Sequence, residues 1–442
     1  MKLEGKSLKR DFLKFIFPSI AAQWVFALYT MVDGIFVARG VSEIALTAVN
    51  ISMPYIMAMY AISILFAVGT STVVAIMLGE NRGKRANEVF SQNIFLLTVF
   101  SVIITVIVML NLRRIAVFLG ATDVNIQYVM DYLKGIVPFS GLFILSYSFE
   151  TLIKTDGFPK MATLIVTAGS LINVVLDYIM VMKLHMGIGG AAYATGIAHV
   201  ALIAMYLLHF CGKKGVIKFV RFHIDLKLIW REIKNGIPSA ITELSPGLII
   251  FLFNQAILRY LNEDALVSYT IISYVNSLAV MTMVGIAQGY QPLISYYFGK
   301  SRMDKCGKLF RYGIAAVIVS SILFTIPCLT GTEFIVHLFL ESDKGALFTY
   351  SVTVFRIFAL SFLLSGYNVV IGAYFTAVER PVAATVISFS RGMVMLIVSL
   401  MTLTALFGGA GIWWCPLVSE ICSLIITLIF LIPYLRSHPF RR

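Results

Sequence analysis

Long apolar segments follow one another along the whole chain, and polar residues are concentrated in the short connections between them. A run of about 20 apolar residues is long enough to cross the hydrocarbon core of a bilayer as an α-helix. The pattern therefore predicts an all-α integral membrane protein with twelve transmembrane helices. The predicted spans are residues 12–38, 46–79, 89–111, 124–153, 161–183, 190–210, 236–260, 266–298, 309–330, 346–376, 382–406 and 412–435.

The second half of the chain repeats the first at an offset of 220 residues. No gap is needed over residues 18–94, and Gly69 then falls on Gly289 and Arg82 on Arg302. Each half contains an even number of spans, so both halves enter the membrane in the same sense, as parallel repeats of secondary transporters do. We therefore expect two parallel-repeat lobes of six helices each, arranged around a central cleft.

The longest polar connection separates these two lobes. It predicts a first lobe at residues 1–210, a cytoplasmic linker at 211–235 and a second lobe at 236–442. The linker contains an amphipathic stretch, which we expect to lie on the inner surface of the membrane.

The distribution of basic residues sets the expected orientation. Of the 35 Lys and Arg residues, 26 fall in the termini and connections on one side, six fall in the loops on the other side, and three fall within spans. Cytoplasmic loops carry the excess of Lys and Arg, so both termini are predicted to be cytoplasmic in a plasma (inner) membrane. The net charge of +13 then reflects topology and contact with anionic lipid, and predicts no nucleic-acid partner.

Composition supports a membrane protein, because 59% of the residues are hydrophobic and only 13% are charged. Soluble domains are closer to one quarter charged. The five cysteines show no metal-ligand spacing, and the six histidines are scattered. No phosphate-binding glycine loop is present, which argues against ATP-driven transport. We expect no enzyme activity, no cofactor and a monomer whose partners are lipids and small-molecule substrates.

Polar side chains on three spans of the first half fall at a similar depth. Asp33 and Asp177 each lie six residues from the outer end of their span, or roughly 9 Å at 1.5 Å per residue. Thr195 lies a few residues into the sixth span, and Asn173 lies one helical turn before Asp177. A carboxylate within a membrane span is costly and is often functional.

Two carboxylates that share an apolar cavity cannot both be ionised cheaply. One must hold a proton, or a cation must lie between them. Oxygen ligands from Asp, Asn and Thr suit Na⁺, and the same pair of carboxylates suits a proton relay, so the residues leave both coupling ions open. The competing interpretation is that each residue is a lone polar group satisfied by a neighbouring helix.

The second half carries different buried charges. Glu243, Arg391 and Glu420 each lie near the predicted midplane, on three different spans, and are predicted to form a cluster. One interpretation is a structural ion pair that fixes helix packing, and the other is a site that responds to substrate or protons.

Four motifs resemble the multidrug and toxic compound extrusion (MATE) family, over essentially the whole chain. They are "VDGIFVARG" (32–40), "INVVLDYIM" (172–180), "GGAAYAT" (189–195) and "GIWWCPLVSE" (411–420). The resemblance implies a drug:cation antiporter of the bacterial or archaeal type, with the coupling-ion site for H⁺ or Na⁺ at Asp33, Asn173, Asp177 and Thr195. In some members the acidic residue of span seven sits one turn later than Glu243, near Pro246 here, which argues against a second sodium site.

Secondary active efflux of organic, cationic small molecules by alternating access is thus the leading hypothesis. A flippase or exporter of lipid-linked or other metabolites from the same wider group is the alternative. Such proteins often have a more basic central cavity and additional helices, whereas this sequence has twelve spans and acidic residues in the first lobe. A membrane-embedded enzyme would need a cluster of catalytic acids, histidines or metal ligands, and a channel would need a filter-like loop; the sequence shows neither.

Overall fold

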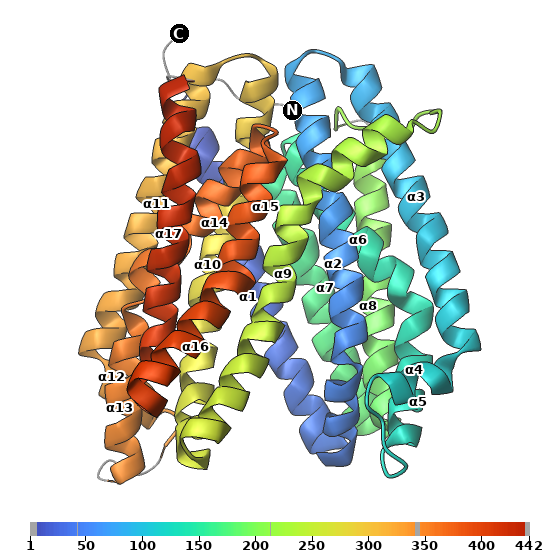
Figure 1. Cartoon of the computed structure of the whole chain (residues 1–442). Helices are drawn as coiled ribbons and strands as arrows, with labels where there is room; N and C mark the ends of the chain where they lie inside the picture. Colours follow the sequence, from blue (N-terminus) through green and yellow to red (C-terminus); the bar gives the residue numbers. More distant parts are fainter. Residues whose placement is uncertain (1–6, 42, 213, 341–344, 438–442) are drawn as a thin grey trace. The chain divides into compact units, whose positions relative to one another are not determined.

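A computed structural model describes residues 7–41, 43–212, 214–340 and 345–437 (Figure 1). Within these ranges the chain is helical apart from short connections, and no strand is present. Eleven helical stretches are long and apolar enough to cross a membrane. The last, Pro381–Ser437, has 57 residues and turns back at Gly408 (φ 58°), so it supplies two crossings. The all-α, twelve-span prediction is confirmed.

The helices of the first half match the predicted spans closely. They are α1 (Leu8–Gly40), α2 (Glu43–Gly79), α3 (Gly83–Leu110), α5 (Ile126–Ile136) followed by α6 (Ser140–Asp156), α7 (Pro159–Asp177) and α8 (Gly187–Phe210).

The helices of the second half repeat this order. They are α9 (Leu226–Tyr260), α10 (Glu263–Gly299), α11 (Met303–Thr330), α13 (Ala346–Ala359) followed by α14 (Phe362–Ala377), α15 (Pro381–Phe389) followed by α16 (Met395–Phe407), and α17 (Gly411–Ser437).

Two short helices show the same repeat outside the spans. Helix α4 (Leu112–Phe118) follows α3, and α12 (Thr332–His337) follows α11, so their first residues lie 332 − 112 = 220 positions apart. Local sequence explains several helix ends. Pro159 and Pro381 open α7 and α15 at the position where a missing N–H costs nothing. Gly157 closes α6 in the left-handed region (φ 101°) that glycine adopts without strain.

The chain divides into two compact units. The first unit comprises Ala21–Gly236, and the second comprises Ser7–Ile20 with Ile237–Arg442. Helices α1 and α9 therefore each contribute to both units. The changes fall close to Pro18 in α1 and Pro238 in α9, two repeat-related prolines within helices, where the backbone lacks a helical hydrogen bond.

The interlobe linker differs from its prediction in one respect. Residues 211–225 are mostly irregular, as expected, but residues 226–235 form the first turns of α9 and are continuous with its membrane span. This segment packs into the first unit through close backbone contacts with α2, because Gly236 faces Leu65 and Gly69 faces Glu232. One face of this segment thus packs on α2, while Leu226 and Trp230 remain exposed on the other.

Each unit has its own apolar core. In the first unit, buried Leu97, Leu133 and Ile144 join α3, α5 and α6. In the second, buried Phe253, Phe355 and Ile412 join α9, α13 and α17. Exposed apolar side chains are common on the outer faces of the spans, as expected for contact with lipid.

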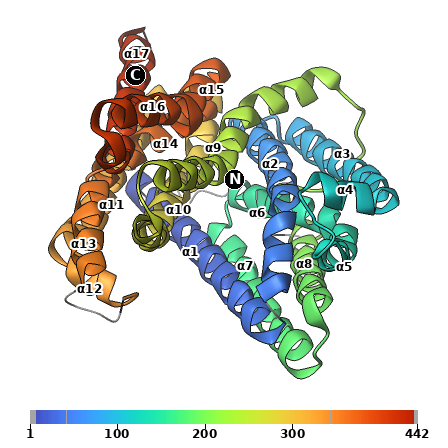
Figure 2. The ribbon, with the colours of Figure 1, turned by 60° about the horizontal axis from the view of Figure 1, so that its bottom comes forward.

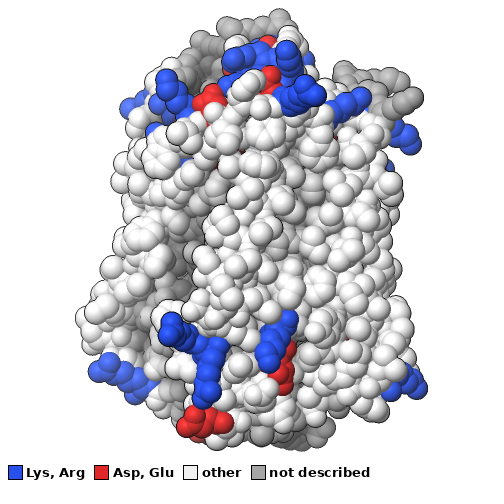
Figure 3. All heavy atoms as spheres, turned by 90° about the vertical axis from the view of Figure 1, so that its right-hand side faces the viewer, with Lys and Arg blue, Asp and Glu red and all other residues white. Residues whose placement is uncertain are grey.

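Charged side chains avoid the middle of the spans on the visible surface. On the face shown in Figure 3, Lys, Arg, Asp and Glu gather toward the two ends and leave an uncharged band between them. This is the pattern that the sequence analysis predicted for a multi-pass membrane protein. Several of the basic residues that were counted there lie outside the described residues: Lys2, Lys6, Lys213, Lys344, Arg441 and Arg442.

The contact between α9 and α2 depends on a glycine. A Cβ atom at position 236 would collide with the backbone carbonyl of Leu65, which cannot move without shifting α2. We therefore expect Gly236→Ala to lower stability by about 1–3 kcal/mol. Gly247→Ala, on the same helix with open space around its Cα, is the matched control and should be neutral or slightly stabilising. Thermal unfolding of the purified variants tests this, and equal melting temperatures would contradict it.

Candidate functional site

Asp33 and Asp177 meet inside the first unit, on α1 and α7. Their carboxyl groups lie within hydrogen-bonding reach of each other. Asp177 is fully buried, and both of its oxygens, like Oδ1 of Asp33, receive no hydrogen bond from any donor in the described part of the chain. Two buried carboxyl groups without donors repel one another unless a proton or a cation lies between them.

Asn173 and Thr195 lie at the same place. Nδ2 of Asn173 points to Oγ1 of Thr195 at 3.4 Å, which links α7 to α8. The Thr195 hydroxyl donates in turn to the carbonyl of Ala191 at 3.0 Å. Oδ1 of Asn173 is buried and has no donor within the described ranges, so it adds another free acceptor one turn from Asp177. The four predicted residues thus lie on α1, α7 and α8, within one unit. Figure 2 shows these three helices.

The backbone changes its hydrogen-bond pattern at the same point. The α-helical part of α7 ends at Asp177, and a π-helical segment, Tyr178–Lys183, continues the span. Such segments are rare and often occur at functional sites, because they alter side-chain directions within a helix. Two aromatic rings lie at the start of the π-helical segment: Phe36 of α1 and Tyr178 have ring centroids 6.4 Å apart.

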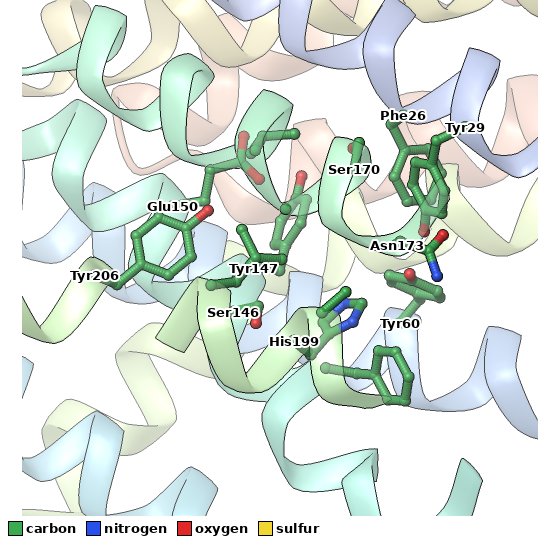
Figure 4. Close-up of a pocket in the computed structure, with 15 residues that line it drawn as sticks. Phe26, Tyr29, Tyr60, Ser146, Tyr147, Glu150, Ser170, Asn173, His199 and Tyr206 are labelled. Carbon is green, nitrogen blue, oxygen red and sulfur yellow. The ribbon is translucent and has the colours of Figure 1, made fainter. Parts of the chain in front are cut away.

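A cavity of about 70 Å³ extends from Asn173 into the first unit. Figure 4 shows Asn173 with Tyr29 and Tyr60 on one side of it, and Glu150 with Tyr206 on the other. A volume of this size holds a few water molecules, whereas pockets for drug-sized ligands have roughly 300–1,000 Å³. The cavity can therefore hydrate the polar residues but does not accommodate a drug-sized molecule in this structure.

The two ends of the cavity differ chemically. At the Glu150 end, Oε1 accepts a hydrogen bond from Nζ of Lys154 at 2.6 Å, and both side chains are largely buried. The charge of Glu150 is therefore compensated within α6. At the Asn173 end, the carboxyl groups of Asp33 and Asp177 have no basic partner in the described part of the chain. This end therefore combines unpaired carboxyl oxygens with the free amide oxygen of Asn173, which are acceptors for a cation.

The second unit contains a satisfied polar network instead. Nε of Arg391 donates to Oε1 of Glu420 at 2.9 Å, and Nδ2 of Asn368 donates to Oε2 of Glu420 at 2.8 Å. Thr427 completes the network by donating to Oδ1 of Asn368 at 2.8 Å. Arg391 lies in a second π-helical segment, Ser390–Val394. Each oxygen of the Glu420 carboxylate has a donor, so the network needs no additional ion.

Glu243 does not join this network. No ion pair or hydrogen bond connects its side chain to Arg391 or Glu420 in the residues that the structure describes. Thr242 and Ser245, on either side of Glu243 in the sequence, face α15 and the π-helical segment after it. The Thr242 hydroxyl donates to Ser388 at 3.2 Å, and Ser245 lies against Gly392. Residue 243 therefore points to another side of α9, since neighbouring residues of a helix diverge by about 100°.

Sequence reasoning did not find several polar residues of these sites. Asn368 and Thr427 are neutral residues in apolar helices, and no spacing relates them to Glu420. His199 lies one turn after Thr195, and its Nδ1 is 2.9 Å from the carbonyl of Thr195. That spacing along one helix face was the available signal for a larger polar region around the site.

A family model described as MatE matches residues 18–179 and 238–401. Together these ranges cover well over half of the chain, and they begin 238 − 18 = 220 residues apart, which is the offset of the repeat. The chain belongs to the MatE family. The resemblance that the four motifs indicated is therefore confirmed.

Multidrug export proteins align with nearly the whole of this MatE family chain. The multidrug export protein MepA of Staphylococcus haemolyticus (strain JCSC1435) is 26% identical over 440 residues, which cover 98% of this chain and 95% of that protein. MepA of Staphylococcus aureus (strain NCTC 8325 / PS 47) is 24% identical over 433 residues, with coverage of 96% and 94%.

Solved structures show the same fold. One is described as the outward-facing conformation of a multidrug resistance MATE family transporter of the MOP superfamily. It matches with a TM-score of 0.90 and 19% identity, over 97% of this chain and 96% of that one. A MATE structure in the bent conformation matches with a TM-score of 0.88 at the same identity, with the same coverage. The MatE chain therefore has the MATE fold.

A double-mutant cycle measures how much the Arg391–Glu420 ion pair of the second unit contributes to the free energy of unfolding. Arg391→Met or Glu420→Gln alone should be strongly destabilising, because each leaves a charged or polar group without its partner. The double variant should lose less than the sum of the two, by about 1–3 kcal/mol.

The same cycle with Glu243→Gln in place of Glu420→Gln is the control and should be additive, since no hydrogen bond or ion pair joins Glu243 to Arg391 among the described residues. Thermal unfolding in detergent provides the measurement. Additivity for the Arg391 and Glu420 pair would show that their contact contributes nothing to stability.

Proposed function

We propose that this MatE family protein exports organic, cationic small molecules by alternating access, driven by a cation that enters the cell through the Asp33 and Asp177 site. Its named relatives are multidrug export proteins, which supports the substrate class. The observation that carries the ion coupling is the facing pair of carboxyl groups, in which Oδ1 of Asp33 and both oxygens of Asp177 are buried and have no donor among the described residues. In a secondary transporter, such a pair provides the free energy link between ion binding and conformation.

The acceptor oxygens favour Na⁺ as the coupling ion. At this site, four buried oxygens have no donor among the residues that the structure describes: Oδ1 of Asp33, Oδ1 of Asn173 and both carboxyl oxygens of Asp177. A single proton shared between the carboxyl groups cannot satisfy the amide oxygen of Asn173. A hard cation prefers several oxygen ligands, including neutral ones, and discontinuous helices in transporters supply such ligands.

Coupling requires the ion to distinguish between conformations. An ion shifts an equilibrium only by its difference in affinity for the two states. Asp33 lies on α1, the helix that contributes residues to both units, whereas Asn173 and Asp177 lie on α7, within one unit. A cation between α1 and α7 therefore favours the conformations of α1 that keep Asp33 beside Asp177. Release of the ion frees α1 from this restraint.

Neutral variants of the carboxylates test the coupling. Asp33→Asn and Asp177→Asn keep the shape of the side chain but remove its charge, so each should abolish gradient-driven efflux while the protein still inserts in the membrane. Substrate binding should survive at least in part. Asp131→Asn, an aspartate on α5 that contacts Gln127, is the matched control and should transport normally.

The measurement is efflux from proteoliposomes with proton and sodium gradients imposed separately. Full gradient-dependent transport by both variants would show that the two aspartates do not couple ion binding to transport.

The neutral ligands distinguish Na⁺ from H⁺. Asn173→Leu and Thr195→Val remove amide and hydroxyl oxygens without changing any charge. If Na⁺ binds here, each change should raise the sodium concentration for half-maximal transport by about tenfold, the effect of losing roughly 1.4 kcal/mol of ion binding. Sodium-dependent quenching of protein fluorescence provides an independent reading of affinity. An unchanged sodium dependence in both variants, with transport following the proton gradient, would assign the site to H⁺.

A further inference from the structure

The carboxyl group of Glu232 is buried in the first unit without a hydrogen-bond partner. Its side chain lies in the second turn of α9, where the residue is completely inaccessible to solvent. Neither oxygen receives a hydrogen bond of acceptable geometry from the described residues, and the hydroxyl of Thr70 beside it is equally unsatisfied. Burial of an ionised carboxylate under these conditions would cost far more than burial of the neutral acid.

The surroundings of Glu232 offer little compensation for a negative charge. Arg231 is the charged neighbour whose field reaches the carboxyl group, and it precedes Glu232 on the same helix. The facing part of α2, residues 65–70 (LFAVGT), carries no ionisable side chain. One hydroxyl is too few oxygen ligands to hold a metal cation. A proton is the ligand that this place can accept.

Two glycines exclude water from the same contact. A Cβ at Gly69 would collide with the carbonyl of Glu232, and a Cβ at Gly236 would collide with the carbonyl of Leu65, so the backbones of α2 and α9 touch on both sides of the carboxyl group. In the repeat-related contact of the second unit, where Gly289 faces Phe15 and Ile16, the position that corresponds to Glu232 is 232 − 220 = 12 and is occupied by buried Phe12, although the preceding Asp11 is also buried. The acid in the first unit is therefore not a requirement of the packing.

The start of α9 is anchored independently of Glu232. Asp225 accepts hydrogen bonds from the backbone N–H groups of Lys227 and Leu228 and pairs with Arg85 of α3 at 2.5 Å. Its own N–H donates to Gln92 at 3.0 Å. The neighbouring residues Trp230 and Lys234 are exposed, but Glu232 itself is buried beside α2, so an ionised Glu232 would have to leave this contact to reach water. It could do so only if the turns between Asp225 and Gly236 loosen from α2.

We propose that Glu232 is a proton-binding site, separate from the Asp33 and Asp177 pair, whose proton holds the inner turns of α9 on α2. Loss of the proton releases these turns. Because α9 contributes residues to both units, the proton occupancy of Glu232 biases the conformation of a helix that belongs to both. The inference goes beyond the proposed export function and does not depend on which ion binds at Asp33 and Asp177.

Infrared spectroscopy reads the protonation state directly. In the Asp33→Asn, Asp177→Asn background, the purified protein should show the C=O stretching band of a buried carboxylic acid, and Glu232→Gln should remove that component. Glu80→Gln, at a half-exposed glutamate near the end of α2, is the control and should leave it unchanged. An unchanged acid band on Glu232→Gln, in the absence of sodium, would mean that Glu232 is ionised and would overturn the proposal.

Backbone hydrogen exchange tests the consequence for α9. At mildly acidic pH, peptides that cover 226–236 should exchange equally in the parent protein and in Glu232→Gln, because both side chains are neutral. At alkaline pH they should exchange about tenfold faster in the parent than in Glu232→Gln, since only the parent can acquire a buried charge. Peptides from α3 should not differ. Glu232→Met serves the same comparison if the Gln variant cannot be purified.

Equal exchange in parent and variant at every pH would show that Glu232 is a passive packing residue. These results are separate from the test of the proposed function, because neither the acid band nor the exchange of α9 depends on transport. Efflux that fails in Asp33→Asn while the Glu232 acid band persists would support both conclusions. Efflux that persists in Asp33→Asn would overturn the export coupling alone.

Discussion

The absence of water in the membrane interior is the constraint from which the rest of this structure follows. A backbone in hydrocarbon must satisfy its own N–H and C=O groups, so the spans are helices. A side-chain charge in the same place needs a counter-charge, a proton or a bound ion. Some buried acids of this molecule have a basic partner and others have none among the described residues. The acids that we propose to bind the coupling ion are among those without a basic partner.

The two units solve the problem of buried acids in opposite ways. In the second unit, Glu420 is neutralised by Arg391 and fully hydrogen-bonded, which suits a structural role that holds α14, α15 and α17 together. In the first unit, Asp33 and Asp177 face each other with no basic partner among the described residues. Only the arrangement of the first unit leaves free acceptors of the kind that our proposed function requires for a coupling ion. The sequence repeat thus keeps one fold in both halves, while the polar residues have become different.

Helices α1 and α9 connect the local chemistry to the larger structure. Each contributes residues to both compact units, and each carries a proline where it changes from one to the other. Each also carries an acid within the first unit, Asp33 on α1 and Glu232 on α9. A ligand that changes the charge of either acid therefore acts on a helix that extends beyond its own site. In our proposals, this is the physical route from ion occupancy to a change in conformation.

The sequence by itself determined the class, the number of spans and most span ends, because hydropathy, proline and glycine act locally and the repeat reinforces each assignment. It also predicted a similar depth for Asp33, Asp177 and Thr195, with Asn173 one turn deeper, since depth follows from counting residues along a helix. Only the tertiary structure decided which side chains meet, because the rotation of each helix is set by packing. Thus Arg391 and Asn368 both bond Glu420, whereas Glu243 does not join them. The same is true of Glu232. In the sequence it belongs to an amphipathic stretch of the linker, and its burial follows only from the contact of α9 with α2 that Gly69 and Gly236 allow.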